Sequence, residues 1–127
     1  MQVTQGYFTP NSEVLEFGCG TGGTSVIHAP YVKHILATDV SQAMIDIGKQ
    51  RAEDAKVSNI DFQKASVEEL DIPIASKDVV LGLSILHLLP NRDQVIHQVH
   101  SWLKPGGVFV TSTACIGDMG LGARVLV

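Results

Sequence analysis

The residues whose types and spacing best suit chemistry lie in one segment, VLEFGCGTGGTS, residues 14–25. Gly18, Gly20, Gly22 and Gly23 allow positive φ angles and let a ligand approach the main chain closely. An apolar run precedes these glycines and a short helix is expected after them, so the N–H groups of a helix N-terminus would face the ligand. Such a loop suits a carboxylate or a phosphate, and the segment therefore predicts a small-molecule binding site.

Two acidic residues accompany this loop. Asp39 lies 21 residues after Gly18, where a carboxylate can accept both hydroxyls of a ribose, although it can also simply cap the next helix. Glu16 would hinder a pyrophosphate and favour a cationic sulfonium with an amino group, or it is a structural acid bonded to loop amides. Gly18, Gly20 and Gly23 also match the dinucleotide-binding pattern, so a nicotinamide cofactor stays open.

Strand and helix patterns alternate along the chain, which indicates an α/β fold with one parallel sheet. Right-handed crossovers would bring the ligand-binding residues to the carboxyl ends of the strands, where the strand order reverses. The expected strands are Glu13–Phe17, His34–Asp39, Ile60–Gln63, Asp78–Ser84 and Val108–Cys115.

Three helices and one capped turn are expected between the strands. They are Thr24–His28, Gln42–Ala55 after the N-cap Ser41, the turn that Ser66 and Glu69 cap, and a helix that Pro90 and Asn91 open and Lys104–Gly107 end. The residues expected to face the sheet are Met44, Ile47, Gly48, Ala52 and Ala55 on the second helix and Val95, Val99, Trp102 and Leu103 on the third.

The composition is that of a single soluble domain, residues 1–127, with 45% hydrophobic residues. A net charge of −4 offers no basic surface for nucleic acid and little attraction to an anionic membrane. Neither a signal sequence nor a membrane span is found, so we expect a cytoplasmic protein. Cys19 and Cys115 are expected to be reduced thiols, and His97 and His100, on the solvent face of their helix, are not expected to bind a metal.

Four motifs in order resemble those of the class I S-adenosylmethionine-dependent methyltransferases, a Rossmann-like family. LEFGCGTG is similar to their first motif, acid-x-G-x-G-x-G, and ATDVSQAMI to the acidic end of their second strand, with Gln42 in place of the usual proline. KDVVLGLSILHLLPN is similar to their fourth strand, and WLKPGGVFV to their Lys-Pro-Gly-Gly turn into the fifth. The resemblance covers about Ser12 to Cys115 and implies a mostly parallel sheet in the order 3-2-1-4-5 with helices on both faces.

The resemblance also implies a cofactor, S-adenosylmethionine, and the residues that would bind it. Its methionine portion would lie along Glu16, Gly18, Cys19, Gly20 and Gly22. Asp39 would hold the ribose, and Val40 and Met44 would touch the adenine or ribose faces, although Met44 also suits a core position. Ser66 and Val67, where the family commonly has an acidic residue and alanine, would meet the adenine amino group.

Further along the chain, Ser84 would lie beside the transferred methyl, with Leu86 and His87 near the substrate. His87 is a candidate catalytic base or, alternatively, a polar residue at a strand end. The reaction would be in-line methyl transfer, which depends mainly on positioning, to an acceptor that we expect to be a small molecule. Two other functions stay open: an S-adenosylmethionine-binding module without catalysis, and an NAD-binding protein.

Compared with the family, the chain is short at both ends, with twelve residues before Glu13 and twelve after Cys115. The usual sixth and seventh strands are therefore expected to be absent, which leaves Val108–Cys115 as an open edge without a charge or a proline. The apolar tail Gly117–Val127 would fold back as a sixth strand or cross to a second copy of the chain. We expect the second outcome, a homodimer through the fifth strand and the tail.

Overall fold

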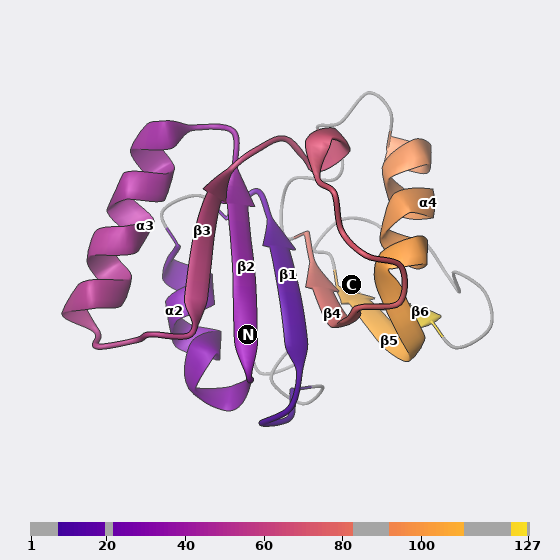
Figure 1. Cartoon of the computed structure of the whole chain (residues 1–127), viewed down its shortest axis with the longest axis horizontal. Coiled ribbons are helices and arrows are strands. Elements are labelled where there is room, and N and C mark those ends of the chain that lie inside the picture. Colours follow the sequence, from indigo (N-terminus) through magenta and orange to yellow (C-terminus); the bar gives the residue numbers. More distant parts are fainter. Residues whose placement is uncertain (1–7, 20–21, 83–91, 111–122, 127) are drawn as a thin grey trace.

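The computed structural model describes residues 8–19, 22–82, 92–110 and 123–126 of the chain. The strands form one sheet in the order β3-β2-β1-β4-β5-β6, in which all neighbouring strands are parallel (Figure 1). They are β1 (Glu13–Phe17), β2 (His34–Asp39), β3 (Ile60–Lys64), β4 (Lys77–Leu81), β5 (Leu103–Val110) and β6 (Ala123–Leu126). The expected α/β fold with the order 3-2-1-4-5 is confirmed, and the order reverses between β1 and β4.

Helices cover both faces of this sheet (Figure 1). The elements are α2 (Gly23–His28), the 3₁₀ helix η1 (Ala29–Tyr31), α3 (Gln42–Asp54), the 3₁₀ helix η2 (Val67–Glu69) and α4 (Arg92–Trp102). Alternate residues of β1 point to opposite faces: Val14 packs in an apolar cluster with residues of η1 and α3, and Leu15 in another with residues of α4 and η2. None of the helices in the described ranges is long and apolar enough to span a membrane.

The buried side of α3 differs from the one that the sequence predicts. Met44 and Ile47 are 37% and 42% exposed, and the buried residues are Ile45, Gly48 and Ala52. The reason is a close approach between α3 and β3, since a Cβ on Gly48 would lie only 2.6 Å from Cε1 of Phe62. This contact turns Ile45 toward the sheet. Of the five predicted core positions only Gly48 and Ala52 are buried, and Ala55 is exposed.

The start of β5 also differs from the prediction. The Lys104–Gly107 segment follows α4 as expected, but it belongs to β5, which begins at Leu103. The pairing of β5 with β4 shifts here, because Leu103 opposes Lys77 whereas Val108 opposes Val79. The extra residues of β5 form a bulge that local sequence patterns do not reveal. Residues 111–115, the rest of the predicted strand, lie outside the described residues.

A sixth strand corrects the expectation that the sheet would lack one. β6 pairs in parallel with β5 of the same chain, from Gly107 opposite Ala123 to Val110 opposite Leu126. Of the two arrangements considered for the tail, the structure of the single chain has the fold-back. The homodimer stays a prediction, without the open β5 edge that supported it.

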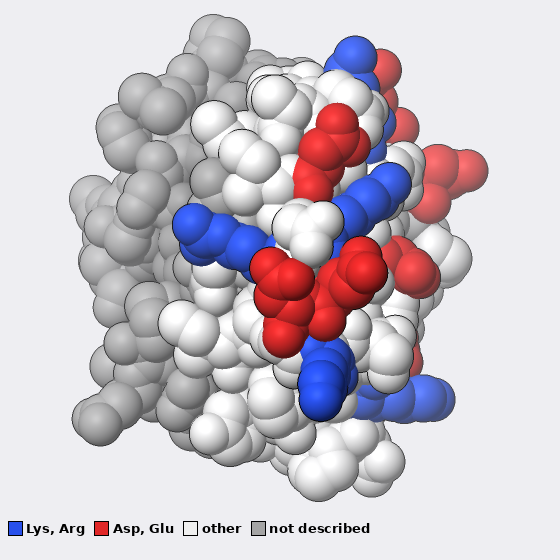
Figure 2. Space-filling model, turned by 90° about the vertical axis from the view of Figure 1, so that its left-hand side faces the viewer, with Lys and Arg blue, Asp and Glu red and all other residues white. Residues whose placement is uncertain are grey.

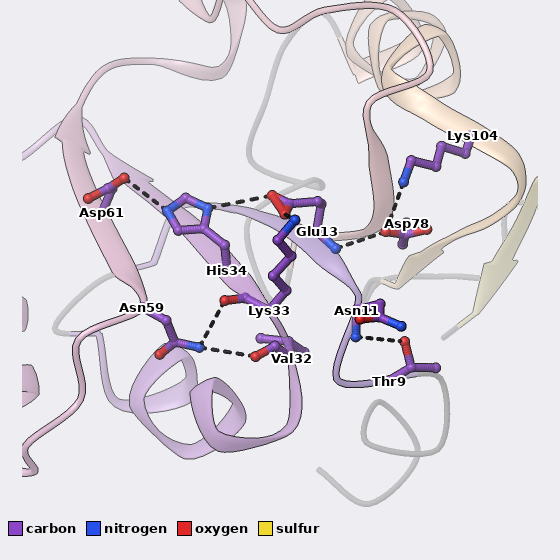
Figure 3. A network of polar contacts seen from close by, with 10 residues as sticks. All are labelled: Thr9, Asn11, Glu13, Val32, Lys33, His34, Asn59, Asp61, Asp78 and Lys104. Carbon is purple, nitrogen blue, oxygen red and sulfur yellow. Dashed lines mark hydrogen bonds and ion pairs between the residues drawn. The ribbon is translucent and has the colours of Figure 1, made fainter.

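Polar side chains join the strands at their amino ends (Figure 3). His34 of β2 contacts Asp61 of β3, with Nε2 and Oδ2 2.9 Å apart, and Glu13 of β1, with Nδ1 and Oε1 3.8 Å apart. Asp78 of β4 accepts hydrogen bonds from the backbone N–H of Glu13 at 2.8 Å and from Nζ of Lys104 at 3.3 Å. This network links β1 to β5 at the end of the sheet opposite the glycine loop.

Candidate functional site

A cavity of about 150 Å³ lies at the carboxyl ends of β1, β2 and β3. Three segments that leave these strands form its wall, and they are Phe17–Gly18, Asp39–Val40 and Ala65–Glu68. The backbone N–H of Ala65 donates to the carbonyl oxygen of Asp39 at 3.0 Å, which ties the exit of β3 to that of β2. The cavity therefore lies at the carboxyl ends of the parallel strands, next to the point between β1 and β4 where the strand order reverses.

Backbone hydrogen bonds hold the glycine loop against β2. The N–H of Cys19 donates to the carbonyl oxygen of Thr38 at 2.9 Å, and the N–H of Gly22 donates to that of Cys19 at 3.1 Å. Gly18 and Gly22 have φ angles of 65° and 77°, the left-handed conformation that favours glycine. Gly18 also lines the cavity, whereas Gly20 lies outside the described residues.

Packing between two helices also requires Gly22. As the N-cap of α2 it lies against α3, and an added Cβ would lie 3.0 Å from the Cα of Gly48 and 3.1 Å from Cε1 of Phe62. A side chain at this position would therefore push α2 away from α3. The sequence predicts Gly22 as a ligand contact, and the structure adds a role in packing that the motif alone does not reveal.

Glu16 is 3% exposed and lies on the face of the sheet that α2 covers. The hydroxyl of Ser25, in α2, donates a hydrogen bond to Oε1 of Glu16. Burial raises the pKa of the Glu16 carboxyl to about 7, and the hydrogen bond from Ser25 opposes part of this effect. The acid thus lies beneath the loop with a hydroxyl partner, and a nearby positive charge would favour its ionised form.

Cys19 contributes its backbone to the loop, while its thiol packs in the apolar core. The side chain is 8% exposed, and burial, followed by the charges of Glu16 and Asp39, raises the pKa of the thiol to about 12. Such a thiol is unreactive at neutral pH. Cys19 is a reduced cysteine, and Cys115 lies outside the described residues.

Asp39 borders the cavity and also holds the turn into α3. Its Oδ1 accepts a hydrogen bond from the backbone N–H of Ser41 at 2.9 Å. Ser41 is the N-cap of α3, as predicted, and its hydroxyl oxygen accepts from the N–H of Met44 at 3.3 Å. The helix is therefore capped by Ser41 and not by Asp39, whose carboxylate instead fixes the turn beside the cavity.

Val40 and Met44, the two apolar residues predicted near the adenine or ribose of the cofactor, lie in different surroundings. Val40 is 64% exposed and lines the cavity. Met44 was predicted to face the sheet, but it is exposed on the first turn of α3 and does not line this cavity. The structure brings Val40, but not Met44, together with Asp39.

Ser66 and Val67 lie at the cavity, on the side opposite the glycine loop in the sheet order. Ser66 is the N-cap of η2 and forms the predicted capping box with Glu69. A second hollow of about 300 Å³ adjoins the cavity, and it is lined by Val40, Lys64, Ala65, Ser66 and Glu69. The two hollows share Val40, Ala65 and Ser66, so they adjoin at the carboxyl ends of β2 and β3.

Several lining residues were not predicted as site residues. Phe17, Ala65 and Glu68 line the cavity, and Glu69 lines the second hollow. Each is adjacent in the chain to a predicted residue or caps the same turn, which is the signal that could have identified them. The predicted residues Ser84, Leu86 and His87 lie outside the described residues.

The end of β4 is fitted closely to this site. A Cβ on Gly82 would lie 2.4 Å from Cζ of Phe17, so only glycine allows the two strand ends to lie this close. The backbone N–H of Gly82 donates to the carbonyl oxygen of Val110 at 3.0 Å, which continues the sheet to β5. Gly82, the last described residue before the predicted substrate-side residues, therefore lies directly beside Phe17.

Comparisons with known proteins agree on the family. A family model described as a methyltransferase domain matches residues 14–107. The uncharacterized methyltransferase YcgJ of Bacillus subtilis is 28% identical over 97 residues, which cover 76% of this chain and 38% of that protein. A probable S-adenosylmethionine-dependent methyltransferase of Mycolicibacterium smegmatis is 30% identical over 101 residues, which cover 80% of this chain and 37% of that protein.

Solved structures show the same fold. The crystal structure of YcgJ matches with a TM-score of 0.79 at 25% identity, over 85% of this chain and 46% of that one. Phosphoethanolamine N-methyltransferase 1 of Haemonchus contortus, in complex with phosphoethanolamine and S-adenosylhomocysteine, matches in fold with a TM-score of 0.78 at 22% identity, over 86% of this chain and 23% of that one. The chain thus spans less than half the length of these relatives. Since the family model covers most of its residues, this protein belongs to the methyltransferases, in the class I S-adenosylmethionine-dependent group that its motifs resemble.

Proposed function

We propose that this chain binds S-adenosylmethionine at the carboxyl ends of β1, β2 and β3 and forms the cofactor-binding part of a methyltransferase that acts on a small molecule. The observation that carries the proposal is the cavity, because it unites residues that the sequence singled out separately. Gly18 leaves β1, Asp39 and Val40 end β2, and Ser66 and Val67 follow β3.

The residues around the cavity suit the adenosine half of this cofactor. Asp39 offers a carboxylate to ribose hydroxyls, and Val40 and Val67 offer apolar surfaces to a planar base. At about 150 Å³ the cavity is smaller than the roughly 300–1,000 Å³ of pockets for drug-sized ligands. It would therefore hold adenosine, while the methionine portion continues along the glycine loop. The bound S-adenosylhomocysteine of the Haemonchus enzyme supports the choice of cofactor.

When bound, S-adenosylmethionine supplies a sulfonium methyl group that a nucleophile can take by in-line displacement. The described residues of this chain bind the cofactor and orient it. The loop main chain at Gly18 lets the ligand approach, and Asp39 fixes the ribose. Glu16, with a pKa raised to about 7 by burial, gains negative charge when a cation lies near the loop, which favours a sulfonium and an amino group over a pyrophosphate. This preference argues against NAD as the ligand.

Calorimetric titration with S-adenosylmethionine, S-adenosylhomocysteine and NAD tests the proposal on one sample. We expect saturable heat with the first two and none with NAD. Binding of NAD alone would contradict the proposal.

A cofactor-binding module without catalysis is the second candidate, because Gly18, Asp39 and Val40, which line the cavity, are residues predicted to bind the cofactor. A radiolabelled methyl-transfer assay on candidate small-molecule acceptors separates the two candidates. Transfer of label identifies an enzyme, and cofactor binding without transfer to any of them favours the module.

Other features of the proposal concern partners and location. Lys and Arg side chains lie among Asp and Glu on the face that Figure 2 shows, which supports a small molecule over nucleic acid as the substrate. A location in the cytoplasm remains part of the proposal. A homodimer remains part of the proposal, and light scattering coupled to size exclusion tests it, since a monomer mass at tens of micromolar protein would contradict it.

A further inference from the structure

Ser66 lies between the two hollows, and both of its polar hydrogens go to one partner. Its hydroxyl donates to Oε1 of Glu69 at 2.8 Å, and its backbone N–H donates to the same oxygen at 3.0 Å. Ser66 lines both hollows, and Glu69 lines the outer one. The two residues therefore act as a unit at the rim of the candidate site.

The charge of Glu69 sets the direction of the hydroxyl bond. The backbone N–H of Ser66, and then its hydroxyl, hold the pKa of the Glu69 carboxyl below its usual value, so the group is a carboxylate at neutral pH. A carboxylate accepts hydrogen bonds and has no proton to donate, so Ser66 must be the donor. The hydroxyl proton is thus directed to Glu69. The hydroxyl oxygen also accepts the backbone N–H of Glu69 in the capping box, so toward a ligand it offers its remaining lone pair.

The turn that carries both residues is anchored in the core. Val67 and Leu70 are 5% and 7% exposed, and they pack in the same apolar cluster as the buried residues of α4. The chain just before Ser66 is hydrogen-bonded to the backbone of Asp39. The acceptor oxygen of Ser66 therefore keeps its position relative to Asp39 when a ligand enters.

We infer that Glu69 is a positioning residue that makes this site selective for the amino group of adenine. It holds the hydroxyl of Ser66 as an acceptor, which bonds to an exocyclic amino group and repels an exocyclic keto oxygen. The inference rests on the proposed function, because it takes the cavity to hold the adenosine half of S-adenosylmethionine. A carboxylate three residues along the turn thus compensates for the missing acid at position 66.

The test compares two ligands that differ at the base, S-adenosylhomocysteine and its 6-keto counterpart S-inosylhomocysteine. Wild-type protein should bind S-adenosylhomocysteine at least about tenfold more tightly than S-inosylhomocysteine. In Glu69→Ala the Ser66 hydroxyl is released and can donate to the keto oxygen, so this preference should fall by about threefold or more. Preferences contributed by other groups are common to both proteins and cancel when the two preferences are compared.

Two further variants serve as controls. Glu69→Gln should retain the preference, because the backbone N–H of Ser66 still needs an acceptor and draws the amide oxygen toward it. Glu53→Ala removes another exposed acid, on α3, and should leave both affinities unchanged. Rescue by glutamine together with loss in alanine identifies the acceptor role of residue 69.

The outcomes separate this inference from the proposed function. If Glu69 had a purely structural role, Glu69→Ala would weaken the binding of both ligands by the same factor. The preference for the adenine ligand would then be unchanged, and this result would overturn the inference. Ser66→Gly gives a second readout should Glu69→Ala fail to fold, since glycine is tolerated at an N-cap and removes the acceptor. An unchanged preference in Ser66→Gly would also overturn it. Wild-type protein that binds neither ligand would instead refute the proposed function, and the inference with it.

Discussion

The two ends of the sheet are built differently, although the same strands run through both. At the amino ends, charged and polar side chains bridge neighbouring strands, as His34 does between Glu13 and Asp61, and as Asp78 does with Lys104 (Figure 3). At the carboxyl ends, a glycine loop and backbone hydrogen bonds connect the strands and leave a cavity between their exits. Side chains bridge the strands at the amino ends, where a hollow of about 320 Å³ is also lined by Thr9, Asp78 and Lys104. The carboxyl ends instead gather the predicted cofactor-binding residues around their cavity.

The difference shows how a small sheet separates stability from binding. At the amino ends, the polar and charged groups of these side chains find their partners within the protein. At the carboxyl ends the connections use main-chain atoms, as between Cys19 and Thr38, so the exits can approach closely while side chains such as Asp39 border the cavity. Mutations at the carboxyl ends should therefore change binding, and mutations at the amino ends should change stability only slightly.

The largest effect is expected from Gly22→Ala, compared with Gly106→Ala. Both glycines have positive φ angles, of 77° and 84°, so alanine at either costs about 1–2 kcal/mol of backbone strain. At Gly22 the Cβ also meets the Cα of Gly48 at 3.0 Å, whereas at Gly106 nothing lies within 4 Å. We expect Gly22→Ala to lower the free energy of unfolding by about 3 kcal/mol or more and to abolish cofactor binding.

Urea unfolding of the two variants and calorimetric titration with S-adenosylhomocysteine measure this difference. Gly106→Ala, near the amino ends, is the matched control and should bind normally. Equal losses of stability in the two variants would show that backbone strain alone accounts for the loss and that the packing of α2 on α3 does not contribute to it.

The next effect concerns Glu16 and pH. Its pKa is about 7 in the folded protein against 4.5 for the unfolded chain, so the folded state binds the extra proton between these values. The stability that Glu16 contributes is therefore complete below about pH 4.5 and is lost as pH rises through 7. Glu16→Gln should gain stability relative to wild type between pH 4 and pH 8, by up to about 3 kcal/mol.

Measuring the difference between Glu16→Gln and wild type isolates this residue. Burial lowers the pKa of His28 to about 4, so His28 makes both proteins less stable as pH falls from about 6.5 toward 4. That opposite contribution is common to both and cancels in the difference. A stability difference that does not vary with pH would refute the raised pKa of Glu16.

A third prediction concerns the affinity that Asp39 provides. Asp39→Ala should weaken binding of S-adenosylhomocysteine by about 1.5–3 kcal/mol, roughly tenfold to a hundredfold, because a charged acceptor for the ribose is lost. It should also lower stability by about 1 kcal/mol, since Oδ1 accepts from the N–H of Ser41.

Asp39→Asn separates these two effects, because asparagine retains an acceptor for Ser41 but not the charge. We expect near wild-type stability with weakened binding. Asp61→Ala, an aspartate in the network at the amino ends, is the matched control and should leave affinity unchanged. Full affinity in Asp39→Asn would mean that Asp39 only holds the turn.

The sequence predicts the parts of this fold that depend on neighbouring residues. The N-cap Ser41, the glycines with positive φ and the apolar strands follow from local chemistry, and the motif order then yields the sheet order. Asp39 was predicted from its place at the end of a strand, and Val40, Ser66 and Val67 from the family resemblance, and all four line one cavity.

The features that the sequence did not reveal depend on contacts between distant segments. The rotation of α3 is set by Gly48 against Phe62 of β3, and the bulge in β5 by its pairing with β4. The pairing of β6 with β5 was one of two alternatives that the sequence left open, because the separate patterns of these segments do not specify a partner. The role inferred for Glu69 needs the direction of a hydroxyl bond, which no residue spacing encodes.

The smallest effect is expected from His34→Ala. The substitution removes the 2.9 Å contact with Asp61 and the 3.8 Å contact with Glu13, but the side chains of His34 and Asp61 are 31% and 78% exposed. Water competes for such exposed contacts, so the free energy of unfolding should fall by less than about 1 kcal/mol. Affinity for S-adenosylhomocysteine should stay within about twofold of wild type, because the network lies at the end of the strands opposite the cavity. Urea unfolding and calorimetric titration measure both quantities. A tenfold loss of affinity in His34→Ala would mean that the two ends of the sheet are coupled, and stability and binding would then no longer be separable along these strands.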